Sequence, residues 1–193
     1  MPNKIEKFWD ELSKEYRFKQ WEKSAVARFD YALTKNILLQ FLKPNKKDKF
    51  LEIGCGPGKW TNLISENCDE IVAVDISKEM IREAKKCCKN RNVRFIHGDI
   101  TQLNLKQKFD KIVAIRSIEY VPDKEKLFEK IAHLMKDNGK IVIITKNKPC
   151  LWDMTKKVKN FWQDKISPNH LEKLCRKHDL NNVTIKPVII RLP

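Results

Sequence analysis

The segment LEIGCGPGKWT, Leu51 to Thr61, contains three of the five glycines of this 193-residue chain. It follows residues 49–53, whose apolar run predicts a short buried strand, and it leads into Trp60, Leu63 and Ile64, whose spacing predicts a helix. Glycine costs backbone entropy and adds no packing, so three glycines here indicate that another group approaches the main chain closely. We therefore expect a ligand site in which N–H groups of the loop and of the first helical turn bind a polar or anionic group.

Strand and helix patterns alternate from residue 49 onward, which predicts βαβ units and a parallel sheet. The expected fold class is α/β, a doubly wound and mostly parallel sheet. Glycine and proline punctuation predicts a helix that starts with Pro122 as its first residue and closes at Gly139. The expected strands are 49–53, 70–74, 93–96, 109–115, 140–145 and 183–190, and the other expected helices of this part start at Lys59, run from Ser77 to about Lys89, and span 169–178.

Two helices are expected before the first strand. Apolar residues recur at helical spacing over residues 3–20, and a second pattern begins after Ser24, a plausible N-cap, and stops before Pro44. A helix outside the main sheet often acts as a lid. The whole chain, 1–193, is thus expected to be one domain, with a helical cap (1–45), a core (46–146) and a final part (147–193) that holds an insertion, a helix and the sixth strand.

Composition excludes several classes of protein. With 41% hydrophobic and 34% charged residues the chain is typical of soluble globular proteins. It has no apolar run of membrane-spanning length, and its first residues lack the apolar core of a signal peptide, so we expect a cytoplasmic protein. Six cysteines without a C-x-x-C pair indicate reduced thiols, and four histidines without a ligand-like cluster predict no metal site.

The formal net charge of +15 has two interpretations. A nucleic acid or an anionic membrane would be a natural partner for such a basic protein. However, the excess is nearly all lysine and is spread along the chain, without an arginine cluster or a basic-aromatic stripe. Genome composition or a heat-adapted surface explains that pattern equally well, so the sequence makes nucleic acid a possible but less favoured partner.

The glycine spacing separates two families of nucleotide-binding loop. Nicotinamide and flavin enzymes have G-x-G-x-x-G, whereas here Lys59 stands where the third glycine would be. The run from Glu52 to Gly58 instead resembles motif I of the class I S-adenosylmethionine-dependent methyltransferases, E/D-x-G-x-G-x-G. The resemblance covers about residues 46–146, and it implies a Rossmann-like methyltransferase fold with S-adenosylmethionine as cofactor and S-adenosylhomocysteine as product.

The resemblance also implies roles for individual residues. Asp75, at the end of the second expected strand, resembles the family's acid that accepts hydrogen bonds from both ribose hydroxyls. Asp99, in His97-Gly98-Asp99-Ile100, resembles the position that binds the adenine amino group. The implied cofactor-binding set is Glu52, Gly54, Cys55, Gly56, Gly58, Asp75, Ile76, Met80, Asp99, Ile100 and Arg116.

The expected chemistry is in-line transfer of a methyl group, which depends mainly on alignment. A general base is needed only for a weakly acidic hydroxyl or a protonated amine. For each candidate beside the methyl group, packing or a salt bridge is an equally open interpretation. These candidates are Tyr16, Trp21, Arg116, Glu119, Tyr120 and His170.

Three functions stay open at this point. The first is methyl transfer to a small-molecule, lipid or glycan-precursor acceptor, the second is methylation of tRNA or rRNA, and the third is a non-catalytic cofactor-binding scaffold subunit. The family's sheet usually has a seventh strand after the sixth, so either the natural protein continues or that strand is lost. In both cases we expect the edge beside the fifth strand to need cover from a partner, such as a second copy in a homodimer, or from residues 151–162. The acceptor and its reacting atom are not encoded in any motif.

Overall fold

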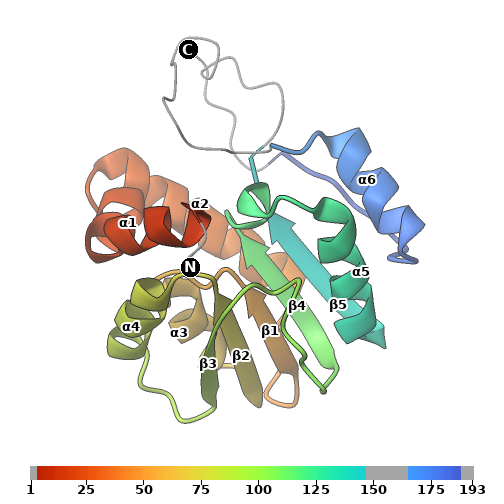
Figure 1. Ribbon diagram of the computed structural model, residues 1–193, viewed down its shortest axis with the longest axis horizontal. Helices are drawn as coiled ribbons and strands as arrows, with labels where there is room; N and C mark the ends of the chain where they lie inside the picture. Colours follow the sequence, from red (N-terminus) through yellow and green to blue (C-terminus); the bar gives the residue numbers. More distant parts are fainter. Residues whose placement is uncertain (1–3, 147–164, 188–193) are drawn as a thin grey trace.

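The computed structural model describes residues 4–146 and 165–187 and has a five-stranded parallel sheet at its centre (Figure 1). The strand order is β3-β2-β1-β4-β5, so the chain adds β2 and β3 on one side of β1 and then crosses to add β4 and β5 on the other. In such sheets ligands bind at this switch point, beyond the carboxyl ends of the strands. The doubly wound α/β fold is therefore confirmed. The strands are β1 (Lys49–Ile53), β2 (Glu70–Asp75), β3 (Val93–His97), β4 (Phe109–Ile115) and β5 (Met135–Ile144).

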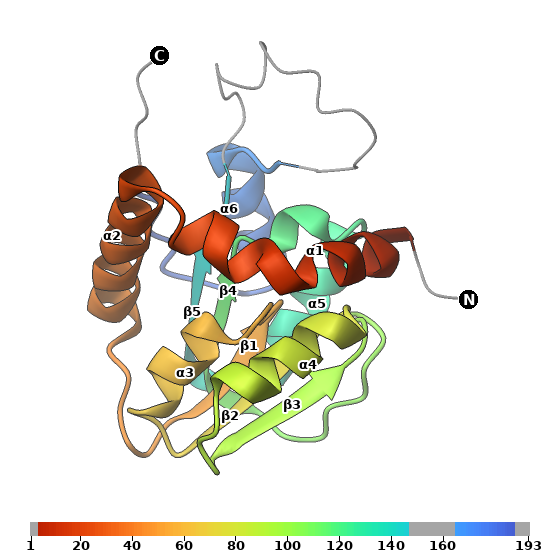
Figure 2. The ribbon, with the colours of Figure 1, turned by 90° about the vertical axis from the view of Figure 1, so that its left-hand side faces the viewer.

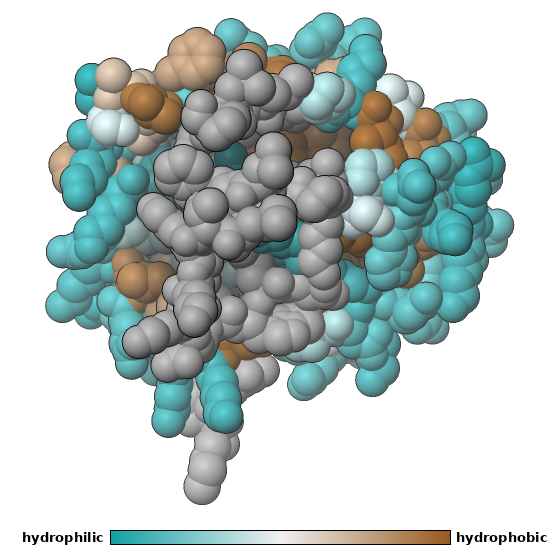
Figure 3. Space-filling view, turned by 90° about the horizontal axis from the view of Figure 1, so that it is seen from above, coloured by the Kyte–Doolittle hydropathy of each residue, from teal (hydrophilic) through white to brown (hydrophobic). Residues whose placement is uncertain are grey.

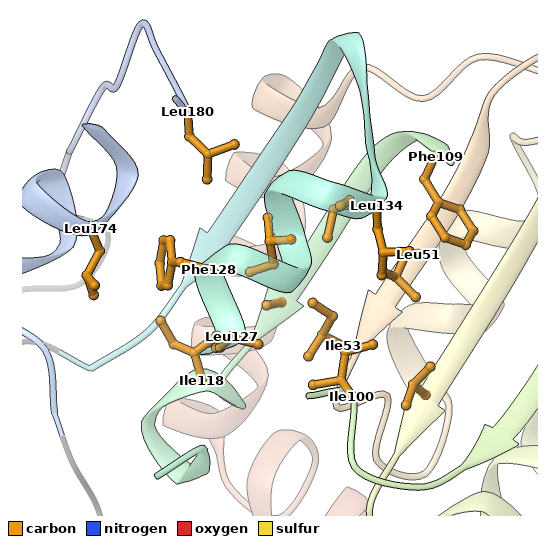
Figure 4. Close-up of a cluster of buried hydrophobic side chains, with 14 of the residues drawn as sticks. Leu51, Ile53, Ile100, Phe109, Ile118, Leu127, Phe128, Leu134, Leu174 and Leu180 are labelled. Atoms are coloured by element: carbon orange, nitrogen blue, oxygen red, sulfur yellow. The ribbon is translucent and has the colours of Figure 1, made fainter. Parts of the chain in front are cut away.

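Helices cover both faces of the sheet, because successive residues of each strand point to opposite sides. Phe50 packs with α2 and α3 on one face, whereas Leu51 belongs to the cluster that α5 and α6 bury on the other (Figure 4). Strands buried on both faces read as continuous apolar runs, as β2 and β4 do. The helices are α1 (Lys4–Trp21), α2 (Ala25–Leu42), α3 (Lys59–Ser65), α4 (Lys78–Cys87), the short 3-10 helix η1 (Ile118–Tyr120), α5 (Lys124–Leu134) and α6 (Pro168–Lys177).

Local capping explains where the first helices begin and end. The Ser24 hydroxyl accepts a hydrogen bond from the N–H of Ala27, so α2 starts as expected. It ends at Leu42, where Lys43 adopts a left-handed conformation (φ 46°) before Pro44. Helix α1 runs above the carboxyl ends of the strands, whereas α2 lies beside the sheet (Figures 1 and 2). The two helices are confirmed, and α1 covers the end of the sheet where ligands bind.

The expected helix from Pro122 to Gly139 is wrong at both ends. The Asp123 carboxylate accepts from the N–H of Lys126 and caps α5, which leaves Pro122 outside the helix. The helix ends at Leu134, and Gly139 lies inside β5. A Cβ on Gly139 would lie 2.4 Å from Cγ of Met135, so the glycine permits a close approach within this strand rather than capping a helix.

The described part of the expected sixth strand does not form a strand. Residues 181–187 form neither helix nor strand, and residues 188–190 of the prediction lie outside the described residues, as does the expected insertion from Leu151 to Trp162. Val183 packs against the cluster under α5 and α6, and Nζ of Lys186 lies 5.5 Å from the Phe41 ring centroid, so side-chain contacts rather than a ladder hold this segment. In the described ranges, β5 is consequently an edge strand.

Hydrophilic side chains dominate the described surface seen from above the sheet (Figure 3). Four large apolar side chains are exposed, and three of them, Phe18, Val26 and Phe29, belong to α1 and α2. None of the helices between residues 4 and 146 or between 165 and 187 combines the length and apolar character that spanning a membrane requires.

Candidate functional site

A pocket lies at the switch point of the sheet, under α1. The segments that follow β1, β2, β3 and β4 form its floor and walls, and α1 contributes Ile5, Trp9, Tyr16 and Trp21. The structure thus brings together most of the residues that the sequence singles out. Those that line the pocket are Tyr16, Trp21, Gly54, Cys55, Gly56, Asp75, Ile76, Met80, Asp99, Ile100, Arg116 and Tyr120.

The three glycines of the first loop all have positive φ, but they serve different purposes. A Cβ on Gly54 would lie 2.3 Å from Cβ of Ser117, and one on Gly58 would lie 2.9 Å from Cα of Ala84, so these two permit close packing. A Cβ on Gly56 would meet nothing within 4 Å. The space above Gly56 is therefore the part of the loop that is open to a ligand.

The expectation of free N–H groups is wrong for the glycine loop, whereas for the first helical turn it stays a prediction. The N–H groups of Gly54 and Cys55 both donate to the carbonyl oxygen of Val74, and that of Gly58 donates to the carbonyl oxygen of Cys55. The N–H of Gly56 donates to Oδ2 of Asp75 at 2.7 Å. Buried backbone donors are costly to leave unpaired, so the loop uses them to fix itself onto β2. Its shape, not free donors, makes room for a ligand.

Asp75 is positioned from both sides. It is 8% exposed, its Oδ2 accepts from Gly56, and its Oδ1 accepts from the N–H of Ser77 at 2.9 Å. Burial raises the pKa of this carboxyl to about 6, against the opposing effect of these two hydrogen bonds. A carboxylate has about four lone-pair sites, so Asp75 retains acceptor capacity toward the pocket.

Residues after β2 and β3 form the neighbouring wall. Oδ1 of Asp99 accepts from the N–H and hydroxyl of Thr101, whereas its Oδ2 has only a long contact of 3.4 Å with Nε2 of Gln102. Ile76, Met80 and Ile100 add apolar surface, and Met80 and Ile100 are buried. One polar acceptor beside flat apolar surface suits a heteroaromatic ring.

Glu52 lies behind the glycine loop and does not line the pocket. It is 1% exposed, and its Oε2 accepts from the hydroxyl of Thr61 at 2.5 Å. Burial raises its pKa to about 8. Cys55 does line the pocket, but burial and the nearby carboxylates of Asp75 and Glu52 raise the pKa of its thiol. A thiol kept protonated is a poor nucleophile, so Cys55 acts as a small wall residue.

Helix α1 is joined to α4 by side chains whose pairing no sequence pattern indicates. Oδ1 of Asp10 accepts from the hydroxyl of Ser77 at 2.5 Å and from the N–H of Glu79 at 3.1 Å. Glu6 lies 3.0 Å from Nε2 of His97, at the end of β3. Because acceptors at a helix N-terminus stabilise it, Asp10 caps α4 from another helix. The lid and the Asp75 segment are therefore held as one unit.

The β4 side of the pocket is aromatic. The ring of Trp9 makes edge contacts with Tyr16 and Tyr120, at centroid distances of 5.2 and 4.8 Å. Burial raises the pKa of the Tyr16 phenol. Trp21 makes an edge contact with Trp60 at 5.2 Å at the far end of α1. These rings give the pocket large, rigid apolar walls.

Three candidates for a catalytic role differ in placement. Arg116 lines the pocket and has a left-handed backbone (φ 54°). Glu119 is fully buried outside the lining, where its Oε2 accepts from the hydroxyl of Thr145 at 3.0 Å and burial raises its pKa. His170 is exposed on the first turn of α6 and is not among the lining residues, so the structure does not bring it to the pocket.

Within residues 4–146 and 165–187, histidine, cysteine and carboxylate side chains form no group of three or more that could hold a metal ion.

Comparison with known proteins agrees with this geometry. A family model described as a methyltransferase domain matches residues 25–185. The ubiquinone biosynthesis O-methyltransferase of Pelagibacter ubique is 31% identical over 150 residues, which cover 74% of this chain and 61% of that protein. The malonyl-[acyl-carrier protein] O-methyltransferase of Priestia megaterium is 31% identical over 103 residues, which cover 52% of this chain and 38% of the relative. The chain thus spans less than two thirds of either relative.

A solved structure, the DhpI-SAM-HEP complex, shares the fold. It superposes with a TM-score of 0.70 at 19% identity, over 89% of this chain and 85% of that one. The shared fold includes the sheet whose carboxyl edge forms the pocket.

Proposed function

Because the chain belongs to the class I S-adenosylmethionine-dependent methyltransferases, we propose that the protein transfers the methyl group of S-adenosylmethionine to a small-molecule acceptor. One arrangement carries the proposal. Asp75 and Gly56 line one pocket, are joined by a hydrogen bond of 2.7 Å, and leave the space above Gly56 open. A vicinal diol fits beside Asp75, whose remaining lone pairs accept from two hydroxyls.

The remaining residues of this half fit the rest of a nucleoside. Oδ2 of Asp99 would accept a hydrogen bond from an exocyclic amino group, and Ile76, Met80 and Ile100 would pack against the ring. The sulfonium group of the cofactor supplies the methyl group and a good leaving group. The chain's own contribution is alignment: holding two reactants in a near-attack geometry supplies about 7–11 kcal/mol of a reaction barrier.

The aromatic walls support a small acceptor. Trp9, Tyr16 and Tyr120 line the pocket beside β4. Helix α1, which carries the first two, lies above the carboxyl ends of the strands (Figure 2). A covered pocket with aromatic walls encloses a small molecule and excludes water. The two relatives compared above carry the names of O-methyltransferases, and an oxygen acceptor is accordingly the first class to test.

Calorimetric titration with S-adenosylhomocysteine tests the cofactor half. We expect one site per chain, and Asp75→Asn should weaken binding about 10- to 100-fold, because hydrogen bonds to a charged group contribute about 1.5–3 kcal/mol. Asp69→Asn, an exposed acid at the opposite end of β2, is the matched control and should bind normally. A wild-type protein that does not bind S-adenosylhomocysteine would overturn the proposal.

The net charge of +15 favours a second candidate, methylation of RNA. Label transfer from S-adenosylmethionine into a cell extract separates the two. After chromatography has removed unreacted S-adenosylmethionine, we expect the label in a low-mass product, whereas label in a nuclease-sensitive, high-mass fraction would favour RNA. An RNA substrate would also bind with a steep dependence on salt concentration, since phosphate contacts release counterions.

A further inference from the structure

The pocket holds two cations, and only one of them has an anionic partner in the described residues. Nζ of Lys59 lies 2.7 Å from Oε1 of Glu22 and 4.2 Å from the centroid of the Tyr31 ring. The guanidinium of Arg116 makes one cation–π contact, in which its Cζ lies 5.9 Å from the centroid of the Trp21 ring. No described carboxylate lies within ion-pair distance of this guanidinium. Arg116 therefore brings an unmatched positive charge into a largely aromatic pocket.

The backbone at Arg116 is held in an unfavourable conformation. A left-handed conformation costs an L-residue with a Cβ about 1–2 kcal/mol. The hydrogen bond from the N–H of Arg116 to the carbonyl oxygen of Ile144, at 2.7 Å, fixes this conformation between the ends of β4 and β5. Strained residues of this kind cluster at ligand sites, because the strain directs a side chain that the ligand needs.

Nearby acidic groups do not neutralise the guanidinium. Burial raises the pKa of Glu119 although Arg116 acts to lower it, and the two side chains form no ion pair among the described residues. Glu119 accepts from Thr145 and lies outside the pocket lining. The phenol of Tyr16 is near enough for Arg116 to favour its charged form, but burial dominates and keeps it neutral. The charge of Arg116 is thus available to a ligand.

The position of Arg116 in the sheet indicates which ligand it serves. The groups that fit a nucleoside, Asp75 and Asp99, follow β2 and β3, whereas Arg116 follows β4, on the other side of the switch point. With a nucleoside bound on the β2 and β3 side, the β4 side of the pocket would be left for the acceptor. Guanidinium groups bind carboxylates and phosphates through two parallel hydrogen bonds and also stack on aromatic rings.

On the basis of the proposed function, we propose that Arg116 binds an oxyanion of the methyl acceptor, so that the acceptor is a small carboxylic or phosphoric acid whose apolar body packs against Trp21, Tyr16 and Tyr120. The cofactor also carries a carboxylate, which has the same chemistry. The experiment must therefore measure the two ligands separately.

The test uses matched acid and neutral probes on protein saturated with S-adenosylhomocysteine. Arylacetic acids of increasing size are each compared with their primary amides, and phenyl phosphate with phenol, by calorimetry. We expect wild-type protein to prefer the acids at least tenfold. Arg116→Asn removes the charge and tolerates the left-handed backbone, so it should abolish this preference while the affinity for S-adenosylhomocysteine changes less than threefold.

Two further variants complete the test. Arg116→Lys keeps the charge without the planar fork and should retain only part of the preference. Arg91→Asn removes an exposed arginine that does not line the pocket and should leave the preference intact. The inference would be overturned if wild-type protein showed no preference for the acids. It would also be overturned if Arg116→Asn lost cofactor affinity tenfold, because that result would assign Arg116 to the cofactor's carboxylate. Absence of cofactor binding in wild type would instead contradict the proposed function.

Discussion

Asp75 and Asp99, on the β2 and β3 side of the pocket, accept hydrogen bonds from the protein itself, whereas Arg116 on the β4 side lacks a carboxylate partner in the described ranges. The first side is thus already organised before a ligand binds, since its loop is fixed to β2. The second side consists of aromatic rings and an unmatched charge. Under the proposed function, the first side would recognise the cofactor by pre-arranged acceptors and the second would set selectivity for the methyl acceptor.

The contact between Gly54 and Ser117 joins the two sides and should give the largest effect. Gly54→Ala places a Cβ 2.3 Å from that of Ser117 at a φ of 72°. Overpacking costs about 1–3 kcal/mol and the left-handed conformation about 1–2 kcal/mol, so urea unfolding should show a loss of about 2–5 kcal/mol. In Gly56→Ala the new Cβ meets open space, so this variant should lose only the stability that the left-handed conformation costs. Equal losses in both variants would contradict this account.

Glu52 tests the organised side through pH. Its folded pKa of about 8 exceeds the model value of 4.5, so its contribution to stability is fully present below about pH 4.5 and is lost as pH rises toward 8. The free energy of unfolding of Glu52→Gln, relative to that of wild type, should therefore rise between pH 5 and pH 8. The expected rise is at least about 1.4 kcal/mol, which corresponds to one pKa unit. Denaturant curves at several pH values measure this, with the exposed Glu11→Gln as control. Parallel curves for wild type and Glu52→Gln would disprove it.

Asp75 should make cofactor affinity depend on pH. The carboxylate must be ionised to accept two hydroxyl hydrogen bonds, and its pKa is raised to about 6. Below pH 6, affinity for S-adenosylhomocysteine should fall about tenfold for each pH unit. Asp75→Asn should bind weakly with a flat profile from pH 5 to 8. A wild-type affinity that stays constant over this range would show that Asp75 does not receive the ligand.

Asp10 tests whether the lid belongs to the organised side. Asp10→Ala removes the acceptor for Ser77 and Glu79, and the loss of such a cap costs about 1 kcal/mol of the free energy of unfolding. Because α1 covers the pocket, S-adenosylhomocysteine should also dissociate several-fold faster in stopped-flow measurements. Glu11→Ala, exposed on the same helix, should change neither quantity. An unchanged dissociation rate in Asp10→Ala would separate the lid from ligand retention.

The sequence predicts local features well where one short segment contains the whole cause. The first four strands begin where expected and end within one residue of expectation, because each is a buried apolar run between turn residues. Ser24 and Ser77 cap the helices that they were expected to cap. Gly139 was misassigned because a glycine after a helical pattern resembles a C-cap, while its actual neighbour, Met135, is placed by the β4–β5 register.

In the candidate site too, features caused by one short segment were predicted, and contacts between distant segments were not. The glycine loop was recognised from its spacing, and Asp75 and Asp99 were implied by the family resemblance. Of these residues, Gly54, Gly56, Asp75 and Asp99 line the pocket. The pairing of Asp10 with Ser77 and of Glu6 with His97 joins residues far apart in the chain, and no periodicity reports such contacts. The involvement of the loop N–H groups with Val74 was also missed, because it depends on how β1 and β2 are aligned.

The packing of Gly54 against Ser117 has an evolutionary consequence. A Cβ at position 54 would lie 3.6 Å from Cα of residue 117, an ordinary contact, so a glycine at 117 would relieve the clash but not the left-handed strain. Such a replacement would also remove the Ser117 hydroxyl that donates to the carbonyl oxygen of Ile53 at 2.7 Å. Substitutions at these two positions are therefore epistatic, since the effect of each depends on the residue at the other. Whether a replacement of Gly54 is tolerated therefore depends on the residue at position 117.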